Sequence, residues 1–503
     1  MLEALFIPQE AGINDVIDEL RVRGVPLVRF ANTFPYKVSE VVGKRDSIRE
    51  TVNRRWGDGM GGWGNGGWGD GEMGRWGDGG NGGMEDGING MLLGRLDYLD
   101  VTKPKVKFYM TGVGISDTVT RYFQDAGLIA LLPGLDICIQ PFLKFGESDE
   151  YPIFFWHDVV GGDLRRAYGC MEFDRINILL GRESLRWGPL PGHSFILSGA
   201  SPAFDLLYAS YEYKLFKGTF FCTSLDPYIL EDTFSVWWRE EPFPEGTYKR
   251  FFSGHRLDFS LFDDKVLIGL SEVIMYSGEG ANFISGYLNP FNFYWAYKRN
   301  RGTGNFTDNI GWGFDFSYYG KNGLCLYGEL LVDDAQYAET EENFPNMLAY
   351  RMGLKGVRGK GFWSLQYARV DTWTYIHQLY WNDYLYLGYP IGHPKGQDFD
   401  EIYGRVVHHL NYNWDITLDF SLMRKGENGF DVLWPGVFPE HQKFPSGVVE
   451  KSTSVEAGFR FFNLPVLSAE LVGGYTWIGN YRNKANETKW FPSIKLKFSR
   501  WLF

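Results

Sequence analysis

Beyond residue 100, apolar and polar residues alternate along the chain with a period of two. The clearest runs are 256–261, 312–318, 416–422, 455–461 and 467–477. Because successive side chains of a strand point to opposite faces, each run predicts a strand with one apolar face and one polar face. The sequence therefore predicts an all-β protein over most of its length.

A soluble sandwich and a membrane barrel both produce this alternation, since the apolar face lines a core in the first and contacts lipid in the second. Two features favour the barrel. Aromatic residues stand at strand ends, as Tyr475 and Trp477 do, and the polar faces carry charges such as Asp419 and Glu456, which a small core would not accept. We therefore predict an antiparallel transmembrane β-barrel of the outer-membrane type.

The last residues point the same way. The chain ends in Phe503, with Trp501 two positions earlier, and this resembles the signal by which bacterial outer-membrane barrels are recognised for assembly. The resemblance implies the barrel assembly machinery as a partner through Phe503. Ile494, Leu496 and Phe498 alternate in the other phase, so we expect a β-bulge near Ser499.

The N-terminal segment differs from the rest. Residues 13–23 place apolar side chains on one helical face and are followed by Gly24, which predicts a short amphipathic helix. A second helical stretch begins near Val38, so residues 1–55 are interpreted as a small helical plug module. Residues 56–92 repeat Trp-Gly-Asp/Asn-Gly units and are interpreted as a flexible insertion, which leaves 93–503 for the barrel.

Composition narrows the function classes. The aromatic content is 17%, there are 63 glycines, and the net charge is −12, so no basic surface is expected to hold nucleic acid. The four cysteines are far apart without metal-ligand spacing, and we expect no metal and no cofactor. No signal peptide is visible at the start of the sequence. If the protein is exported, the numbering omits the signal peptide. The cysteines are Cys138, Cys170, Cys222 and Cys325.

Residues 174–205 carry the most specific motif. Gly181-Arg182 precedes Trp187-Gly188-Pro189, and further motifs follow in order at 254–257, 269–272, 289–290 and 308–309. Together they resemble the capsule assembly protein Wzi family. The motif residues we expect to be structural are Gly181, Arg182, Trp187, Gly188, Pro189, Arg256, Glu272, Asn289, Pro290, Asp308 and Asn309.

The resemblance implies a barrel of about eighteen strands in the bacterial outer membrane, with the N-terminal helices at its periplasmic mouth. It implies a non-enzymatic, lectin-like protein that binds and anchors capsular polysaccharide or exopolysaccharide at the cell surface. Surface polysaccharide and outer-membrane lipid are the partners it implies. A porin-like channel for small saccharides is the alternative, and an outer-membrane hydrolase is a further one.

Charged residues near the motifs are expected to line the lumen and to pair with one another rather than to hold a ligand. They are Arg182, Glu183, Arg186, Arg256, Asp258 and Glu272. Gly188, Pro189 and Pro191 are expected to shape a turn.

The best ligand candidates lie between residues 371 and 398, where aromatic side chains alternate with turn residues. Sugars bind by stacking on aromatic faces and by hydrogen bonds to carboxylates. The alternative is that these rings belong to an interfacial aromatic girdle. The candidates are Trp373, Tyr375, His377, Tyr380, Trp381, Asp383, Tyr384, Tyr386 and Asp398.

Catalytic interpretations find little support. His193 precedes Ser194, but no motif places a second histidine or a carboxylate beside them. Asp333 and Asp334 are adjacent and would point to opposite faces of a strand, so they cannot act together on one substrate. We therefore expect no catalytic residues.

Overall fold

The computed structural model describes residues 13–23, 29–30, 32–34, 106–116, 120–132, 135–145, 160–235, 241–279, 281–300, 308–334, 345–411, 413–432, 443–463 and 467–501. The predicted helix over 13–23 is α1 (Ile13–Val22). The second predicted helix, the predicted boundaries at 55 and 92, the whole 56–92 insertion and Phe503 lie outside the described residues.

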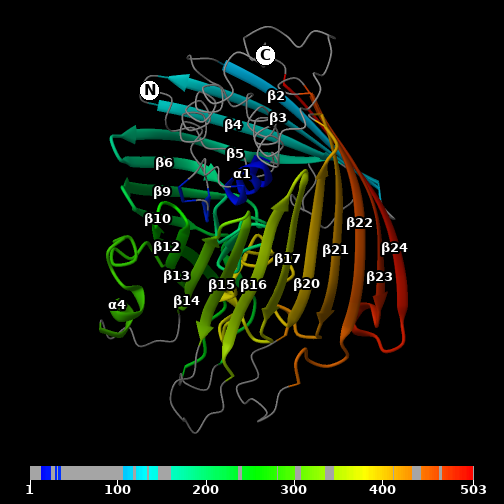
Figure 1. Ribbon diagram of the computed structural model, residues 1–503. Coiled ribbons are helices and arrows are strands. Elements are labelled where there is room, and N and C mark those ends of the chain that lie inside the picture. The colour runs from blue at the N-terminus through cyan, green and yellow to red at the C-terminus, as the bar shows by residue number, and fades with distance from the viewer. Residues whose placement is uncertain are drawn as a thin grey trace.

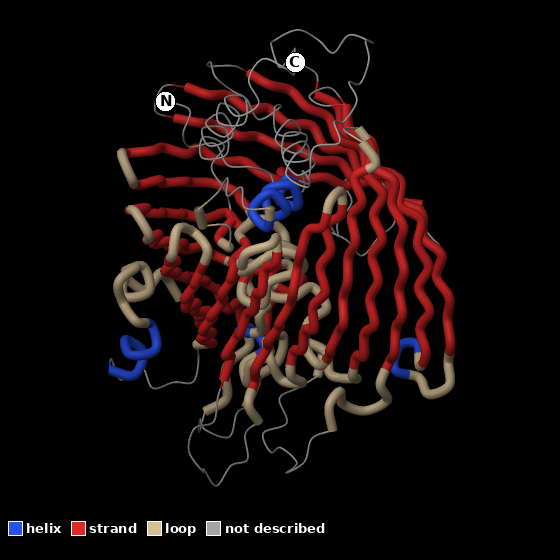
Figure 2. The backbone as a smooth tube through the Cα atoms, viewed as in Figure 1, coloured by secondary structure: helices blue, strands red, loops and turns tan. Residues whose placement is uncertain are grey.

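Strands dominate the described part of the chain (Figures 1 and 2). The long strands are β2 (Val106–Ser116), β3 (Thr120–Leu132), β4 (Leu135–Phe145), β5 (Val160–Phe173), β6 (Ile176–Glu183), β9 (Phe204–Tyr213), β10 (Phe216–Ser224), β12 (Gly246–Leu261), β13 (Val266–Glu279), β14 (Asn309–Tyr319), β15 (Leu324–Asp334), β16 (Met347–Arg358), β17 (Gly361–Val370), β20 (Phe399–His409), β21 (Trp414–Lys425), β22 (Glu450–Asn463), β23 (Leu467–Gly479) and β24 (Thr488–Trp501).

Short elements lie between them. They are β1 (Thr33–Phe34), β7 (Arg186–Trp187), β8 (Leu197–Ser198), β11 (Tyr228–Leu230), β18 (Leu385–Tyr386), β19 (Tyr389–Pro390), helix α4 (Tyr294–Asn300) and the 3-10 turns η3 (Tyr380–Asn382) and η4 (Tyr481–Asn483).

The long strands form one closed antiparallel barrel. Each pairs with its neighbours in chain order, and β24 closes the circuit on β2 with Trp501 opposite Tyr109. The short β11 pairs with β12 beyond the end of β10, so the described strands occupy eighteen positions around the barrel. The predicted outer-membrane barrel fold is confirmed.

The two ends of the barrel differ. At the end where β2 begins and β24 stops, connections are short, such as the turns 174–175 and 214–215. At the other end they are long, and include 184–203 and 371–398. In outer-membrane barrels the short turns face the periplasm and the long loops face the exterior, which orients this chain.

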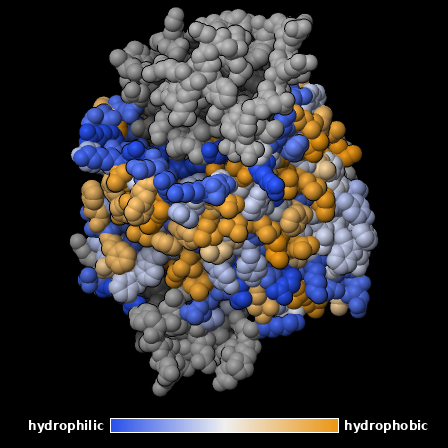
Figure 3. All heavy atoms as spheres, viewed as in Figure 1, coloured by the Kyte–Doolittle hydropathy of each residue, from blue (hydrophilic) through white to orange (hydrophobic). Residues whose placement is uncertain are grey.

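The outer wall is apolar. Leu418, Leu422, Val455, Phe459 and Leu471 all have exposed side chains on the strand faces that were predicted to be apolar. On the face seen in Figure 3, hydrophobic side chains gather across the middle of the barrel, and hydrophilic ones are more frequent toward its ends. This is the lipid-facing band that a membrane barrel requires.

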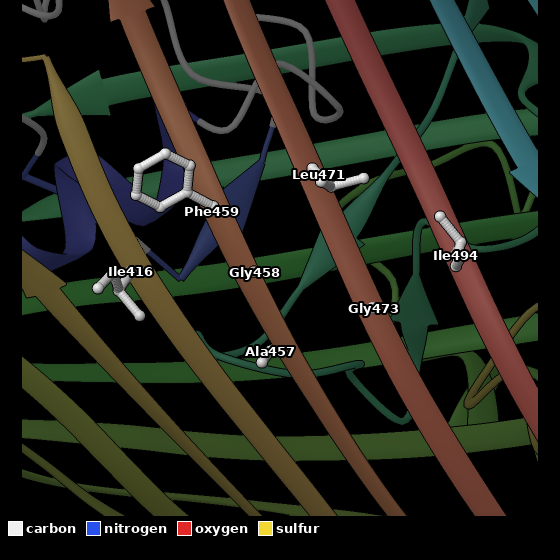
Figure 4. A pocket seen from close by; sticks show the side chains of 7 residues that line it. All are labelled: Ile416, Ala457, Gly458, Phe459, Leu471, Gly473 and Ile494. Atoms are coloured by element: carbon white, nitrogen blue, oxygen red, sulfur yellow. The ribbon is translucent and has the colours of Figure 1, made fainter.

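A shallow apolar depression interrupts this wall across β21 to β24 (Figure 4). Ala457 and Gly473, which are paired across β22 and β23, have little or no side chain. The larger side chains of Ile416, Phe459, Leu471 and Ile494 surround them. No polar side chain lines the depression, so it offers sugar hydroxyls no hydrogen bond.

The end of β24 corrects one prediction. It pairs with β23 from Thr488 to Arg500 and with β2 from Ile494 to Trp501 in unbroken register. The predicted bulge near Ser499 is therefore wrong, because two regular neighbours hold the strand and leave no place for an unpaired residue.

Among the described residues, no helix has the length and apolar character needed to span a membrane. The four cysteines are buried, and none of them forms a disulfide.

Candidate functional site

Two of the long loops turn back into the barrel and pack against each other (Figure 2). The hydroxyl of Tyr375 donates to the main-chain oxygen of Phe195 at 2.8 Å, and that of Tyr384 donates to the oxygen of Ile196 at 2.8 Å. The amide of Ser198 donates to the oxygen of Ile391 at 3.2 Å. Loops 184–203 and 371–398 thus form one body, called the plug below.

The barrel wall holds the first of these loops through a buried ion pair. Glu329 on β15 lies 2.8 Å from Arg351 on β16, and its carboxylate also accepts the amide of Phe195 at 2.7 Å. Arg351 donates to the main-chain oxygens of Pro189 and Pro191. The two opposite charges lie side by side and bond to the loop backbone, so each offsets part of the cost of burying the other in the lumen.

Gly188 of this loop cannot be replaced easily. Its φ is +135°, and a Cβ atom there would come within 2.6 Å of Ser194 Oγ and 2.9 Å of Glu329. The conformation at Gly188 therefore favours glycine where the loop turns into the lumen.

The N-terminal segment meets the plug inside the barrel. Strand β1 pairs with β7, and β7 pairs with β8 of the first loop. On α1, Asp18 is paired with Lys355 of β16, and the ammonium of Lys355 also donates to the main-chain oxygen of Leu190 at 2.9 Å. Lys355 thus connects the helix to the loop that comes from the opposite end.

A second charged network surrounds Arg256 on β12. Its guanidinium lies 2.7 Å from Asp258 and 2.6 Å from Asp315, and it donates to Thr33 Oγ1 at 2.8 Å. Asn32 donates to Asp315 at 2.7 Å. These side chains lie in the lumen and hold β1.

Two charges predicted for the lumen lie on the outer face instead. Arg182 alternates with the exposed Leu180 and pairs with Asp163 and Asp205 at the rim. Glu272 shares its face of β13 with the exposed Leu270. Strand alternation separates two faces of a strand but does not show which face points inward. The predicted lumenal position was therefore wrong for Arg182 and Glu272. The other predicted charges are buried within the barrel: Glu183, Arg186, Arg256 and Asp258.

Glu272 is buried on the outer face because another long loop covers it. Residues 281–300, called the outer clasp below, include α4 and lie outside the wall (Figure 1). The carboxylate accepts the amides of Tyr294 at 2.7 Å and Trp295 at 3.0 Å, and the indole N–H of Trp312 at 2.9 Å. His255 lies 3.4 Å away.

The remaining motif residues stabilise this clasp or its neighbours. Asn289 accepts the amide of Phe291 within the turn that contains Pro290. Asp308 accepts the hydroxyl of Tyr287 at 2.7 Å, and Asn309 donates to the main-chain oxygen of Asn382 in the plug. The motifs at 254–257, 269–272, 289–290 and 308–309 thus meet on one side of the barrel.

Most of the predicted sugar-binding side chains lie inside the plug. His377 and Tyr380 are partly exposed, whereas the others are buried. These buried residues are Trp373, Tyr375, Trp381, Asp383, Tyr384, Tyr386 and Asp398. Their rings contact other parts of the plug and the inner wall, so they do not form an interfacial girdle.

Asp398 holds two extracellular loops together. It has a positive φ of 57°, and its carboxylate accepts the hydroxyl of Thr372 at 2.9 Å and the amide of Ser446 at 3.0 Å. This residue therefore fixes the end of the plug instead of facing solvent.

Burial also sets the protonation of the plug. It raises the pKa of Asp383 to about 8, although the nearby Arg250 and the amide of His377 oppose the shift. Burial likewise raises the pKa of Tyr375 and of Tyr384. At neutral pH these groups are mostly uncharged, which suits a packed interior.

An accessible group of rings, which the sequence did not reveal, lies at the extracellular end. Phe234 packs on Tyr380 at 4.8 Å between ring centroids, and Tyr228 lies 6.0 Å from Trp381. Trp381 lies beneath them, stacked on Tyr248 at 4.5 Å. Tyr228, Phe234 and Tyr380, called the aromatic shelf below, come from two separate loops, so no local pattern could show that they meet.

The described residues contain no group of three His, Cys, Asp or Glu side chains that could hold a metal ion. His193 contacts the ring of His393, with 5.6 Å between the ring centroids.

Comparison with known proteins decides the family. The model of the family described as "Capsule assembly protein Wzi" matches residues 124–490, which is most of the chain. The chain belongs to the capsule assembly protein Wzi family. The resemblance seen in the motifs is thereby confirmed.

A solved structure shares the fold of this chain. The Wzi protein of Escherichia coli, described as an outer membrane protein involved in group 1 capsule assembly and a carbohydrate-binding β-barrel, superposes with a TM-score of 0.63 at 15% identity, covering 98% of each chain. The Pseudomonas aeruginosa OccK1 superposes at 0.47 with 11% identity, covering 80% of this chain and 99% of its own. No curated protein sequence matches the chain.

Membership of the Wzi family and the closed lipid-facing barrel place this protein in the outer membrane. The plug and the outer clasp are therefore features of an outer-membrane member of the Wzi family.

Proposed function

We propose that this protein binds surface polysaccharide at its extracellular end and holds it at the cell surface, without catalysing a reaction. Membership of the capsule assembly protein Wzi family carries the proposal. The carbohydrate binding described for the Escherichia coli Wzi protein, which shares the fold, supports it.

The plug supports a holding role over transport. Two loops, β1 and α1 meet in the lumen. A buried ion pair between Lys355 and Asp18 ties α1 to the wall, and the wall residues Arg351 and Arg256 donate hydrogen bonds to the first loop and to β1. Such a filled interior favours a rigid support for extracellular residues over a wide saccharide channel.

We propose the aromatic shelf as the contact surface within the predicted 371–398 region. Tyr380 and Phe234 are partly exposed at the extracellular end, where a pyranose could stack on an aromatic ring. Single contacts of this kind are weak, but a polymer presents many repeats, so the overall retention is strong. The buried rings below, above all Trp381, would hold the shelf in place.

The test is retention of the purified, detergent-folded protein on surface polysaccharide extracted from its own source cells. We expect Tyr380→Ala and Phe234→Ala to reduce retention about tenfold or more together, since stacking contributes about 0.5–1.5 kcal/mol per ring pair. Tyr375→Phe is the matched control, because it alters a buried tyrosine and leaves the shelf intact.

Two results would overturn the proposal. One is wild-type protein, shown to be folded, that is not retained by any extracted glycan. The other is glycan turnover or a large steady single-channel conductance in a planar bilayer, which would indicate a hydrolase or a porin-like channel.

Two further partners belong to this proposal. Outer-membrane lipid surrounds the apolar wall, and the barrel assembly machinery recognises the C-terminal Phe503 during insertion. Deletion of Phe503 is expected to reduce the amount of folded barrel in the outer membrane without changing glycan retention by the protein that does fold.

A further inference from the structure

The outer clasp has an inner face that is fully packed. The rings of Tyr287 and Tyr294 form a buried cluster with Phe251, Ile274 and Tyr276 of the outer wall. Together with the bonds from Glu272 to the clasp amides, this cluster fixes residues 281–300 against β12, β13 and β14. The clasp is therefore packed firmly against the outside of the barrel wall.

Its other face is apolar and exposed. Phe291 is 93% exposed and Phe293 is 53% exposed, and Ile284 is also exposed. The guanidinium of Arg299 lies 5.3 Å above the ring of Trp295 at the end of α4. An exposed apolar group of this size on a rigid support marks an interaction surface.

The position of the clasp identifies what covers that surface. Glu272 and His255, on which it sits, are each two residues along their strands from the lipid-facing Leu270 and Leu257. Two strand residues span about 7 Å. The clasp thus begins directly beside the apolar band, on its extracellular side, and its exposed face continues that band.

We propose that the outer clasp anchors the barrel in the outer leaflet of the membrane. Phe291 and Phe293 insert among the acyl chains near the headgroups, and Arg299 lies at the level of the anionic headgroup phosphates. Aromatic side chains with a neighbouring cation are the composition that proteins place at this boundary. This inference is independent of polysaccharide binding.

The test uses the full-length protein with a single introduced cysteine. Phe291→Cys and Phe293→Cys are labelled with a nitrobenzoxadiazole dye, and the native cysteines, all buried, serve as the unlabelled background. Ala485→Cys is the matched control, because Ala485 is an exposed residue of the extracellular β23–β24 loop. Each protein is reconstituted in phosphatidylethanolamine and phosphatidylglycerol vesicles with or without doxyl-labelled phosphatidylcholine.

We expect the doxyl lipid to reduce dye emission about twofold or more at positions 291 and 293 and to leave position 485 unchanged, as for groups in acyl chains and in water. Heat-modifiable mobility on gels shows that each variant is folded. Emission at 291 and 293 that is no more quenched than at 485 overturns the proposal, and so does equal quenching at all three positions.

Discussion

The plug and the outer clasp use one device on opposite faces of the same wall. In each, a long extracellular loop folds back, and a strand glutamate accepts its main-chain amides: Glu329 accepts Phe195 inside, and Glu272 accepts Tyr294 and Trp295 outside. The surroundings differ. Glu329 is paired with a guanidinium, whereas Glu272 has the indole of Trp312 and the ring of His255 beside it.

The difference shows how each face supports a buried carboxylate. In the lumen, a network of fixed charges compensates for lost hydration, and the loop is held by polar contacts. On the outer face, aromatic rings exclude solvent and three N–H donors satisfy the carboxylate. Removal of the group that pairs with the buried carboxylate should therefore reduce stability most inside the barrel, where that group carries a full opposite charge.

Arg351→Met is expected to have the largest effect. It leaves Glu329 buried without its cation and also removes two donors to the plug, so the free energy of unfolding should fall by about 3–5 kcal/mol. Urea denaturation of the folded barrel in detergent measures this. The control is Arg182→Met at the exposed rim, which should cost under about 1 kcal/mol, and equal losses in the two variants would contradict the comparison.

Glu272→Ala should have the next largest effect, and it should be local. Three hydrogen bonds to one carboxylate are lost, so the free energy that holds the clasp should fall by about 2–3 kcal/mol. Hydrogen exchange at Tyr294 and Trp295 should become much faster, while exchange at Phe195 in the plug stays unchanged. Glu272→Gln, which keeps an acceptor oxygen, should give an intermediate exchange rate. Faster exchange in both the clasp and the plug would show that the two loops are not held independently.

The third prediction concerns pH and applies to the plug. The pKa of Asp383 is raised to about 8, whereas in an open loop it would be about 3.9. Between these two pH values, Asp383 is protonated in the closed plug and ionised in the open loop. The stability of the closed plug therefore falls as pH rises from about 3.9 to about 8, and it levels off above about pH 8. Within this pH range, the equilibrium constant for opening of the plug rises by up to about tenfold per pH unit.

Protease cleavage within residues 371–398, followed from pH 5 to pH 9, checks this. Asp383→Asn should remove the dependence because it cannot ionise. A steeper rise in cleavage toward low pH would show that the sign is wrong.

The smallest effects are expected from single hydroxyls. Tyr375→Phe and Tyr384→Phe each remove one hydrogen bond between the two plug loops and should each cost about 1 kcal/mol. Tyr380→Phe, at the partly exposed shelf, should cost nearly nothing. Urea midpoints distinguish these cases, and a loss at Tyr380 as large as at Tyr375 would mean that the shelf also supports the plug.

Strand alternation was enough to predict the strands and their apolar faces, because each lipid-facing side chain of β21 to β24 has one environment that its neighbours in the strand reveal. Leu418 and Phe459 were assigned correctly for this reason. The choice of a barrel over a sandwich also needed the aromatic strand ends and the charged polar faces. Alternation could not predict that the loop after β13 would fold back and cover Glu272. In the sequence, Glu272 is a charged residue and is therefore expected to face the lumen. The hydrogen-bond donors of the clasp, which allow it to face outward, are not visible in the strand pattern.

The 371–398 region shows a second limit. Its composition pointed to a sugar-binding loop, which stays a prediction, and the burial of its side chains depends on which other loop fills the same space. Tyr375 and Tyr384 are buried because residues 195 and 196 accept their hydroxyls, a contact between segments far apart in the chain. The aromatic shelf, built from two loops, could not be predicted for the same reason.

Lys355 gives the molecule a mechanical connection across the membrane. Its ammonium contacts Asp18 of the N-terminal helix and the oxygen of Leu190 in the loop that descends from the cell exterior. Tension applied to the extracellular end, as by a long polymer pulled by flow, would pass down this loop to the wall and the helix together. The force would be shared among several buried contacts and would not fall on one surface loop.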